Sequence, residues 1–153
     1  MGVGLDRGGD GSGDVARRFT DRIIEGAWEI EGDRRNAAIE AARGRWILEV
    51  DADERVSAAL ASEIAETVAT SASDWHLIPV DNYVGARLIR HGWGASFGRS
   101  AVPGLFRKGA KSWGKERVHP RLVFTGRQGA ALRNRLDHYV DRSLSDLIPR
   151  LAT

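Results

Sequence analysis

The first half of the chain alternates short apolar runs with amphipathic segments, which predicts alternating strands and helices. Strands are expected at residues 3–5, 22–25 and 45–50, and helices at residues 15–21, 33–43 and 57–70. Leu60, Ile64 and Val68 recur every four residues and predict the buried stripe of the last helix, with Ser57 as its N-cap. This alternation favours a parallel sheet with right-handed crossovers.

The second half has shorter apolar runs separated by Gly, Pro and Asn, which predict strands joined by turns. These strands are expected at residues 75–84, 87–89, 101–106, 117–124 and 136–140. A mixed or antiparallel part of the sheet is therefore predicted there. A last helix is expected from Ser143 with an interruption at Pro149, and residues 92–104 are the best candidate for a mobile loop.

The helix at residues 33–43 is rich in alanine and is followed by Gly44, which is predicted to be its C′ residue. The next apolar run, Trp46–Val50, is continuous enough to suit a strand buried on both faces of a parallel sheet. Ligands of open α/β sheets bind at the carboxyl ends of such strands. The residues that follow this run are therefore candidates for a binding site.

Two carboxylates, Asp51 and Asp53, follow the apolar run directly. Residues i and i+2 of an extended segment point to the same side, so both side chains are expected to converge on one divalent cation, which could grip a diphosphate. The alternative interpretation is that these acidic residues only start a loop or cap the next helix. The pattern of residues around them leaves both interpretations open.

Composition restricts the class of protein. The length of 153 residues predicts one domain, and 42% hydrophobic with 29% charged residues is typical of a globular protein. The chain has no cysteine, which excludes disulfides and thiolate metal sites, and its four histidines lack zinc-type spacing. No apolar run reaches the roughly 20 residues of a membrane span, and a secretory signal is missing, so a cytoplasmic location is expected.

The charge balance is mildly basic, with a net charge of +2. Nearly all of the positive charge is arginine, which suits bidentate contacts with phosphate and carboxylate. The arginines are mixed with acidic residues along the chain and form no basic stripe interleaved with aromatic residues. Nucleic-acid binding is therefore not expected, and an anionic ligand is weakly favoured.

Several motifs in order resemble glycosyltransferase family 2, and more narrowly the branch related to lipopolysaccharide-core glucosyltransferases and other bacterial cell-envelope sugar transferases. The similarity covers essentially the whole chain, and its most specific part is the strand followed by Asp-Ala-Asp-Glu-Arg. The motifs are Asp6 in a glycine-rich turn, Arg35-Asn36 in the alanine-rich helix, Trp46 to Val56, His91-Gly92-Trp93, Leu105-Phe106-Arg107, Val118-His119 and His138-Tyr139.

This resemblance implies an α/β fold of the GT-A type, with a mixed sheet and flanking helices. It also implies a nucleotide-sugar donor, with a UDP-sugar favoured, a divalent metal (Mg²⁺ or Mn²⁺), and a glycan or lipid-linked acceptor at the inner face of the membrane, where peripheral contact is expected. Residues 1–153 are then a single, partial domain. The similarity begins within the family's second strand, so the first strand is predicted to be missing, and it stops where the family's distal helices begin.

The resemblance assigns contacts with the nucleotide sugar to Asp6, Arg35, Asn36 and Asp51. Asp6 falls where these enzymes contact the nucleobase or ribose. The alternatives are an Asx-turn for Asp6 and a solvated helix face, or an ion pair with Glu31, for Arg35.

The metal ligands implied by the resemblance are Asp51 and Asp53, with His138 as a further ligand. A cation there would stabilise the charge of the departing nucleoside diphosphate. The alternative for His138 is a histidine whose hydrogen bonds are satisfied inside a sheet.

An inverting transferase needs a carboxylate base to accept the proton of the acceptor hydroxyl. Relatives carry an acid where this chain has Pro120, so the candidate bases are Glu54 and Asp81. The alternatives are that Glu54 pairs with Arg55 and that Asp81 begins a turn with Asn82.

Two functions are therefore predicted. The first is a metal-assisted, inverting glycosyltransferase, and the second is a catalytically inactive fragment or remnant of such an enzyme. A receiver domain that is phosphorylated at Asp51 or Asp53 is disfavoured, because the second half does not continue the alternation of strands and helices.

Overall fold

The computed structural model describes residues 1–7, 11–89, 99–118 and 120–141, and these residues form a mixed α/β fold. The chain divides into two compact units. The first unit comprises residues 1–47 and 107–126, and the second comprises residues 48–106 and the chain from residue 127 onward. The α/β class is as predicted, and the larger sheet is mixed.

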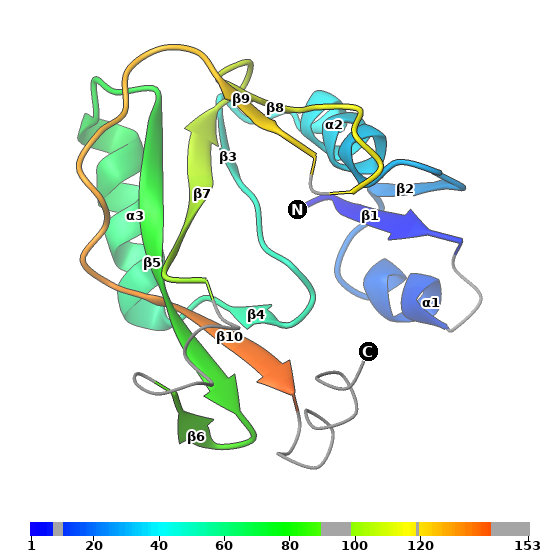
Figure 1. Ribbon diagram of the computed structural model, residues 1–153, viewed down its shortest axis with the longest axis horizontal. Coiled ribbons are helices and arrows are strands. Elements are labelled where there is room, and N and C mark those ends of the chain that lie inside the picture. Colours follow the sequence, from blue (N-terminus) through cyan, green and yellow to red (C-terminus); the bar gives the residue numbers. More distant parts are fainter. Residues whose placement is uncertain (8–10, 90–98, 119, 142–153) are drawn as a thin grey trace. The chain divides into compact units, whose positions relative to one another are not determined.

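The first unit contains a short parallel sheet and an antiparallel hairpin (Figure 1). Strands β1 and β2 pair in parallel, and β8 pairs with β9. Helix α2 contacts β1 and β8, and it approaches β8 so closely at Gly32 that an added Cβ would collide with the carbonyl oxygen of Gly114. The described elements are β1 (Val3–Asp6), α1 (Ser12–Arg17), β2 (Ile23–Gly26), α2 (Glu31–Ala41), β8 (Lys111–Trp113) and β9 (Leu122–Phe124).

The larger sheet has the strand order β3-β7-β5-β10-β4, with β6 paired to β5 (Figure 1). Strand β10 lies between β5 and β4, parallel to β5 and antiparallel to β4. Strands β6 and β7 both pair with β5 in the antiparallel direction. The elements are β3 (Trp46–Leu48), β4 (Glu54–Arg55), α3 (Ala58–Thr70), β5 (Trp75–Val84), β6 (Arg87–Leu88), β7 (Ala101–Arg107) and β10 (Leu136–Asp141).

Strand β5 shows how its sequence determines its packing. Its residues alternate between buried and partly exposed positions from Trp75 to Tyr83, as the period of two in a strand requires. Ile78 and Val80 contribute to the core of the second unit, and Asn82 continues the same buried row. Among the residues that the structure describes, the largest fully buried side chains are Leu60, Ile78, Leu105, Phe106 and Leu136.

Helix α3 confirms the predicted N-cap and alters the predicted stripe. The Ser57 hydroxyl accepts a hydrogen bond from Leu60 N–H at 3.2 Å. Leu60 is fully buried, but Val68 is 36% exposed and the second buried residue of the helix is Glu63. Burial of a carboxylate in place of an apolar residue is tolerated because Glu63 accepts hydrogen bonds from the segment before β10, including Asn134 N–H at 2.8 Å.

Helix α2 ends differently from the prediction. It ends at Ala41 with Ala42 as an extended C-cap, so Gly44 is not its C′ residue. The Lys108 ammonium donates hydrogen bonds at 2.7 Å to the carbonyl oxygens of Glu40 and Ala42. A side-chain cation therefore satisfies terminal carbonyls where a left-handed glycine was expected.

Strand β3 corrects the prediction of a strand buried on both faces. It ends at Leu48, before Val50, and it stands at one end of the strand order. Leu48 is 36% exposed and Val50 is 39% exposed. A nearly continuous apolar run, interrupted by Glu49, thus belongs to an edge strand and the coil after it, because burial depends on the neighbouring strands and not on the run alone.

The remaining predictions are partly confirmed. The parallel sheet expected in the first half is confirmed for β1 and β2, which pair in parallel with α1 between them, but β3 belongs to the larger sheet. The mixed pairing expected in the second half is confirmed, because β5 pairs in parallel with β10 and in the antiparallel direction with β7. Strands β4 and β8 were not predicted, α1 lies earlier than residues 15–21, and the strand expected at 117–124 is reduced to β9. The helix from residue 143 lies outside the described residues, as does most of the loop at 92–104.

No helix within the described ranges is long and apolar enough to cross a membrane.

Candidate functional site

The acidic motif forms a tight turn between β3 and β4. Glu54 N–H donates a hydrogen bond to the carbonyl oxygen of Asp51 at 3.1 Å, and Asp51 N–H donates to Glu54 Oε2 at 2.8 Å. The expectation of an extended segment from Asp51 to Asp53 is therefore wrong. The two aspartates do not share a strand face by alternation, and other contacts determine where each carboxylate lies.

The Asp51 carboxylate contacts an arginine that precedes β7. Asp51 Oδ2 lies 3.5 Å from Arg99 Nη1, and their side chains are 31% and 55% exposed. An ion pair this accessible to water contributes little to stability, so a ligand can compete with it at low cost. Arg99 is also a donor that could contact an anionic ligand.

The Asp53 carboxylate lies beside His138 of β10. Asp53 Oδ2 is 3.4 Å from His138 Nε2, and the carbonyl oxygen of Asp53 accepts a hydrogen bond from Tyr139 N–H at 2.9 Å. In the sheet, His138 is paired with Glu54 across β4 and β10. The register of β4 against β10 thus holds the acidic turn next to the histidine.

The other ring nitrogen of His138 contacts β5. His138 Nδ1 lies 2.9 Å from Asn82 Oδ1, and Asn82 Nδ2 donates to the carbonyl oxygen of Arg99 at 2.9 Å. Asn82 is 9% exposed. A chain of polar contacts therefore runs from Asp53 through His138 and Asn82 to the backbone of Arg99.

Burial raises the pKa of the Glu54 carboxyl above its ordinary value. The hydrogen bond from Asp51 N–H opposes this shift, and the negative charge of Asp51 adds to it. The charge of His138, when its ring is protonated, and the charge of Arg99 oppose the shift more weakly. A carboxylate whose pKa is displaced towards neutrality is better suited to proton transfer than an ordinary one.

Asp81, the other predicted base, belongs to a different face of β5. Neighbouring residues of a strand project to opposite faces, so Asp81 points away from the face on which Asn82 contacts His138. Asp81 Oδ1 accepts a hydrogen bond from Arg135 Nε at 2.6 Å, and its side chain is 13% exposed. The structure brings Glu54, Asp53 and His138 together and does not bring Asp81 to them. Asp81 also lies inside β5, so it does not begin a turn with Asn82.

Asp6 stands at the carboxyl end of β1 in the first unit. Its Oδ1 accepts a hydrogen bond from Trp28 N–H at 3.2 Å, which joins the end of β1 to the segment that follows β2. The indole of Trp28 covers Gly26, where an added Cβ would lie 2.7 Å from the ring. Asp6 is therefore positioned by a contact between neighbouring strands.

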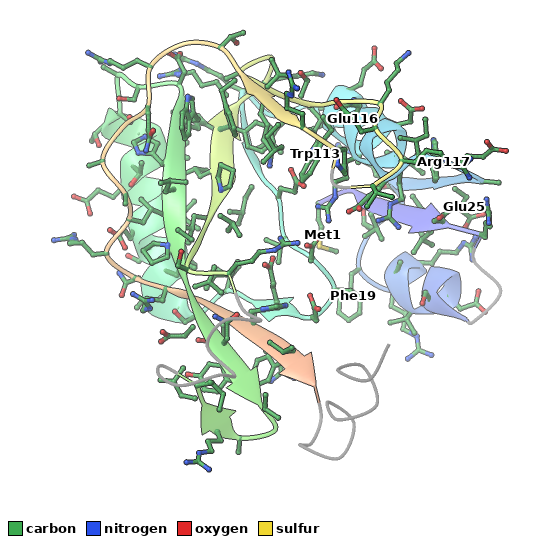
Figure 2. All side chains as sticks on the ribbon, in the orientation of Figure 1. Met1, Phe19, Glu25, Trp113, Glu116 and Arg117 are labelled. Atoms are coloured by element: carbon green, nitrogen blue, oxygen red, sulfur yellow. The ribbon has the colours of Figure 1, made fainter. Side chains whose placement is uncertain are left out.

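Arg35 and Asn36 both contact Trp113 of β8, which Figure 2 labels beside α2. Asn36 Nδ2 donates to the carbonyl oxygen of Trp113 at 2.8 Å, and Asn36 Oδ1 accepts from Trp113 N–H at 2.9 Å. The Arg35 guanidinium lies 4.7 Å from the centre of the Trp113 ring and donates to Glu31 at 2.8 Å. The expected Arg35–Glu31 pair is present, and both predicted donor-binding residues also hold α2 to β8.

Within the described ranges, no group of three or more His, Cys, Asp or Glu side chains could hold a metal ion. Asp53 and His138 nevertheless provide two donors whose chemistry suits a divalent cation. Their separation of 3.4 Å is close to the roughly 3 Å between neighbouring ligands of an ion with bonds of about 2.1 Å. Mg²⁺ in phosphate-binding sites commonly takes one or two carboxylates and completes its shell with phosphate oxygens and water.

Sequence reasoning did not identify Asn82 and Arg99 as parts of this site. A signal for Asn82 exists, because it occupies the position in β5 where the alternation set by Ile78 and Val80 calls for an apolar residue. Arg99 lies in a glycine-rich segment without periodicity, and no pattern in the sequence distinguishes it from the other arginines.

No protein-family model matches this chain, and no curated protein matches it.

Proposed function

We propose that this chain is a glycosyltransferase domain of the GT-A type. It would transfer a sugar, with inversion and with the help of a divalent metal, from a nucleotide-sugar donor to a cell-envelope glycan or lipid acceptor. A UDP-sugar is the favoured donor. The single observation that carries the proposal is the meeting of Asp53 and His138 beside the acidic turn that follows β3.

The assignment of the metal rests on the donors in the second unit. Asp53 and His138 would hold the ion, and Asp51 would join them by exchanging its contact with Arg99 for the cation. When bound, a divalent cation supplies positive charge to the leaving diphosphate. Arg99, released from Asp51, would contact the same anionic group.

The assignment of the base rests on Glu54. The position of its carboxyl in the acidic turn is fixed by its hydrogen bond with Asp51 N–H, and burial raises its pKa. The ionised Glu54 carboxylate would accept the proton of the acceptor hydroxyl as that oxygen attacks the anomeric carbon. Asp81 is the weaker candidate, because Arg135 engages it on the other face of β5.

The contacts with the nucleotide are proposed separately for the first unit, where Asp6, Arg35 and Asn36 retain the roles that the resemblance implies. Their test is the affinity for UDP alone. Asp6→Asn should weaken it, whereas Asp21→Asn, an exposed acid of the same unit, should not.

The second candidate function is a remnant that keeps the fold and lacks turnover. The observation that favours it is Pro120, which stands where the resembled family carries an acid and offers no carboxylate. The proposals differ in one measurable property, which is the release of nucleoside diphosphate.

Binding of the donor site can be tested by titration calorimetry with UDP in the presence of Mn²⁺. Asp53→Asn and Asp51→Asn should each weaken binding at least tenfold, because each removes an anionic ligand. The matched control is Asp137→Asn, which makes the same change on the same strand as His138 but on the opposite face. No binding by the wild type, or equal loss in the control, would contradict the donor site.

Turnover can be tested by the release of nucleoside diphosphate from a panel of UDP- and GDP-sugars with cell-envelope acceptors. Release that Glu54→Gln abolishes supports the transferase. Binding without release from any donor supports the remnant.

A further inference from the structure

We infer that Asn82 is a positioning residue that holds His138 in the tautomer with its proton on Nδ1. The Nε2 lone pair is then directed at Asp53, and the two side chains are poised to take up one divalent cation. The uptake of a cation by Asp53 and His138 rests on the proposed function, whereas the tautomer of His138 does not. The inference follows from one chain of contacts in the second unit, from Arg99 to Asp53.

The first step is the orientation of the Asn82 amide. The carbonyl oxygen of Arg99 accepts a hydrogen bond at 2.9 Å, so the atom of the Asn82 amide that faces it must be the NH₂ group. The other end of the amide, Oδ1, therefore faces His138 Nδ1 at 2.9 Å. An amide oxygen can only accept, so His138 Nδ1 must carry the proton.

The second step is the burial of Asn82. At 9% exposure the amide is largely removed from water, which makes an unpaired donor or acceptor costly. Rotation of the amide would set Oδ1 against the carbonyl oxygen of Arg99, so the hydrogen bond to Arg99 would be lost and two acceptors would face each other. The geometry therefore keeps the proton on Nδ1 of the neutral ring.

The third step concerns His138 Nε2. In the neutral ring this atom is an acceptor, and it faces another acceptor, Asp53 Oδ2, at 3.4 Å. Without Asn82, the ring could move its proton to Nε2 and donate it to Asp53. The hydrogen bond to Asn82 opposes that change and leaves two acceptors facing each other, an arrangement that a shared cation stabilises.

His76 provides an internal comparison in the same unit. Its Nδ1 lies 2.8 Å from the carbonyl oxygen of Ala130 and must donate, and its Nε2 lies 2.8 Å from the Ser71 hydroxyl, which can donate in return. Both histidines are thus expected to carry the proton on Nδ1. They differ in the partner of Nε2, which is a hydroxyl for the buried His76 and a carboxylate for His138.

The tautomer can be measured by long-range ¹H–¹⁵N correlation spectra of the ¹⁵N-histidine-labelled chain at about pH 8, where imidazole is normally neutral. His138→Gln assigns the signals. In the wild type we expect a protonated Nδ1 and an unprotonated Nε2 for His138. Asn82→Leu should move the proton of His138 to Nε2, and Asn82→Asp, which keeps an oxygen acceptor, should retain it on Nδ1.

The His76 signals in the same spectra report whether each variant is folded, because His76 is buried near the amino end of β5 and Asn82 lies near its carboxyl end. If Asn82→Leu does not fold, the wild type and Asn82→Asp decide the question. A wild-type His138 with its proton on Nε2, or with protons on both nitrogens, would overturn the inference. So would a folded Asn82→Leu protein with an unchanged tautomer.

Addition of substoichiometric Mn²⁺ tests the metal separately. Paramagnetic broadening of His138 Nε2 that exceeds that of His76 supports binding at the Asp53–His138 pair. Broadening should weaken in Asn82→Leu, whose Nε2 carries a proton. A wild type with the expected tautomer and no selective broadening would contradict the metal site of the proposed function while the role of Asn82 stands.

Discussion

Glu54 and Glu63 are both removed from water in the second unit, and their pKa values shift in opposite directions. Burial favours the neutral acid for each. Glu63, 8% exposed, accepts four hydrogen bonds, from the backbone and side chains of Arg133 and Asn134, and they lower its pKa to about 2 against the effect of burial. Glu54 receives a hydrogen bond from Asp51 N–H and lies near the charge of Asp51, and its pKa is raised.

The comparison separates a structural carboxylate from a reactive one. Charge on Glu63 is matched by donors that belong to the segment before β10, so this residue acts as a permanent anionic anchor between that segment and α3. Charge on Glu54 is less well matched, and its proton equilibrium is closer to neutral pH. The number of donors, not burial, therefore distinguishes the two roles.

The largest expected effect is on turnover. Glu54→Gln removes the proposed base and should lower kcat by roughly 10²- to 10⁴-fold, with little change in the affinity for UDP. Glu66→Gln, on the exposed face of α3, is the control and should leave kcat unchanged. Steady-state release of UDP measures kcat for both variants. Normal turnover of Glu54→Gln would show that Glu54 is not the base.

The next effect is on stability. Glu63→Ala leaves the partly buried backbone N–H groups of Arg133 and Asn134 without their acceptor and should lower the free energy of unfolding by about 3 kcal/mol. Urea denaturation measures the loss. Glu66→Ala in the same helix should change stability by less than about 0.5 kcal/mol. Equal losses for the two variants would contradict the anchor.

The pH dependence of the anchor follows from the lowered pKa of Glu63. The folded protein holds the proton of Glu63 less tightly than the unfolded chain, so its stabilising contribution is complete above about pH 4.5 and is lost as the pH falls towards 2. The difference in urea midpoint between the wild type and Glu63→Gln should therefore shrink over this range. A difference that is independent of pH would argue against an ionised anchor.

The smallest effect concerns the stability contribution of Glu54. Its raised pKa means that the folded state binds the proton more tightly, so the favourable contribution present below pH 4.5 is lost as the pH rises through the folded-state pKa. Glu54→Gln, whose amide oxygen can still accept from Asp51 N–H, should then be as stable as the wild type or more stable at pH 7, by less than about 1 kcal/mol. Marked destabilisation would make Glu54 a second anchor.

Local patterns predicted the elements whose cause is local. Ser57 caps α3 because a hydroxyl before a helix can reach an N–H two or three residues later, and the alternation of β5 is visible over its whole length. Strand β4 could not be predicted, because it is short and is defined by β10, a partner distant in the sequence. Strand β8 is also short, and its Lys-Ser-Trp sequence has no apolar run that would indicate a strand. The edge position of β3 likewise depends on the strand order.

The candidate site was predicted in part for the same reason. The acids Asp51, Asp53 and Glu54 are conspicuous in the sequence, and His138 was assigned to them through the resemblance. Their geometry was not predictable, because the turn replaces the expected extended segment. The role of Asn82 depends on which ring nitrogen faces it, and only the pairing of β5 with β10 determines that.

The position of β10 between β5 and β4 also affects the order of folding. His138 lies 56 residues after Asn82, its partner on β5. Contacts over such separations form slowly, because a long loop must close before they stabilise the chain. Helix α3 and the β5–β6 hairpin can form early, whereas the acidic turn acquires its histidine only when β10 inserts. The ionisable groups of the site therefore meet only after β10 has paired with β5 and β4, so a chain that lacks this pairing does not present them together.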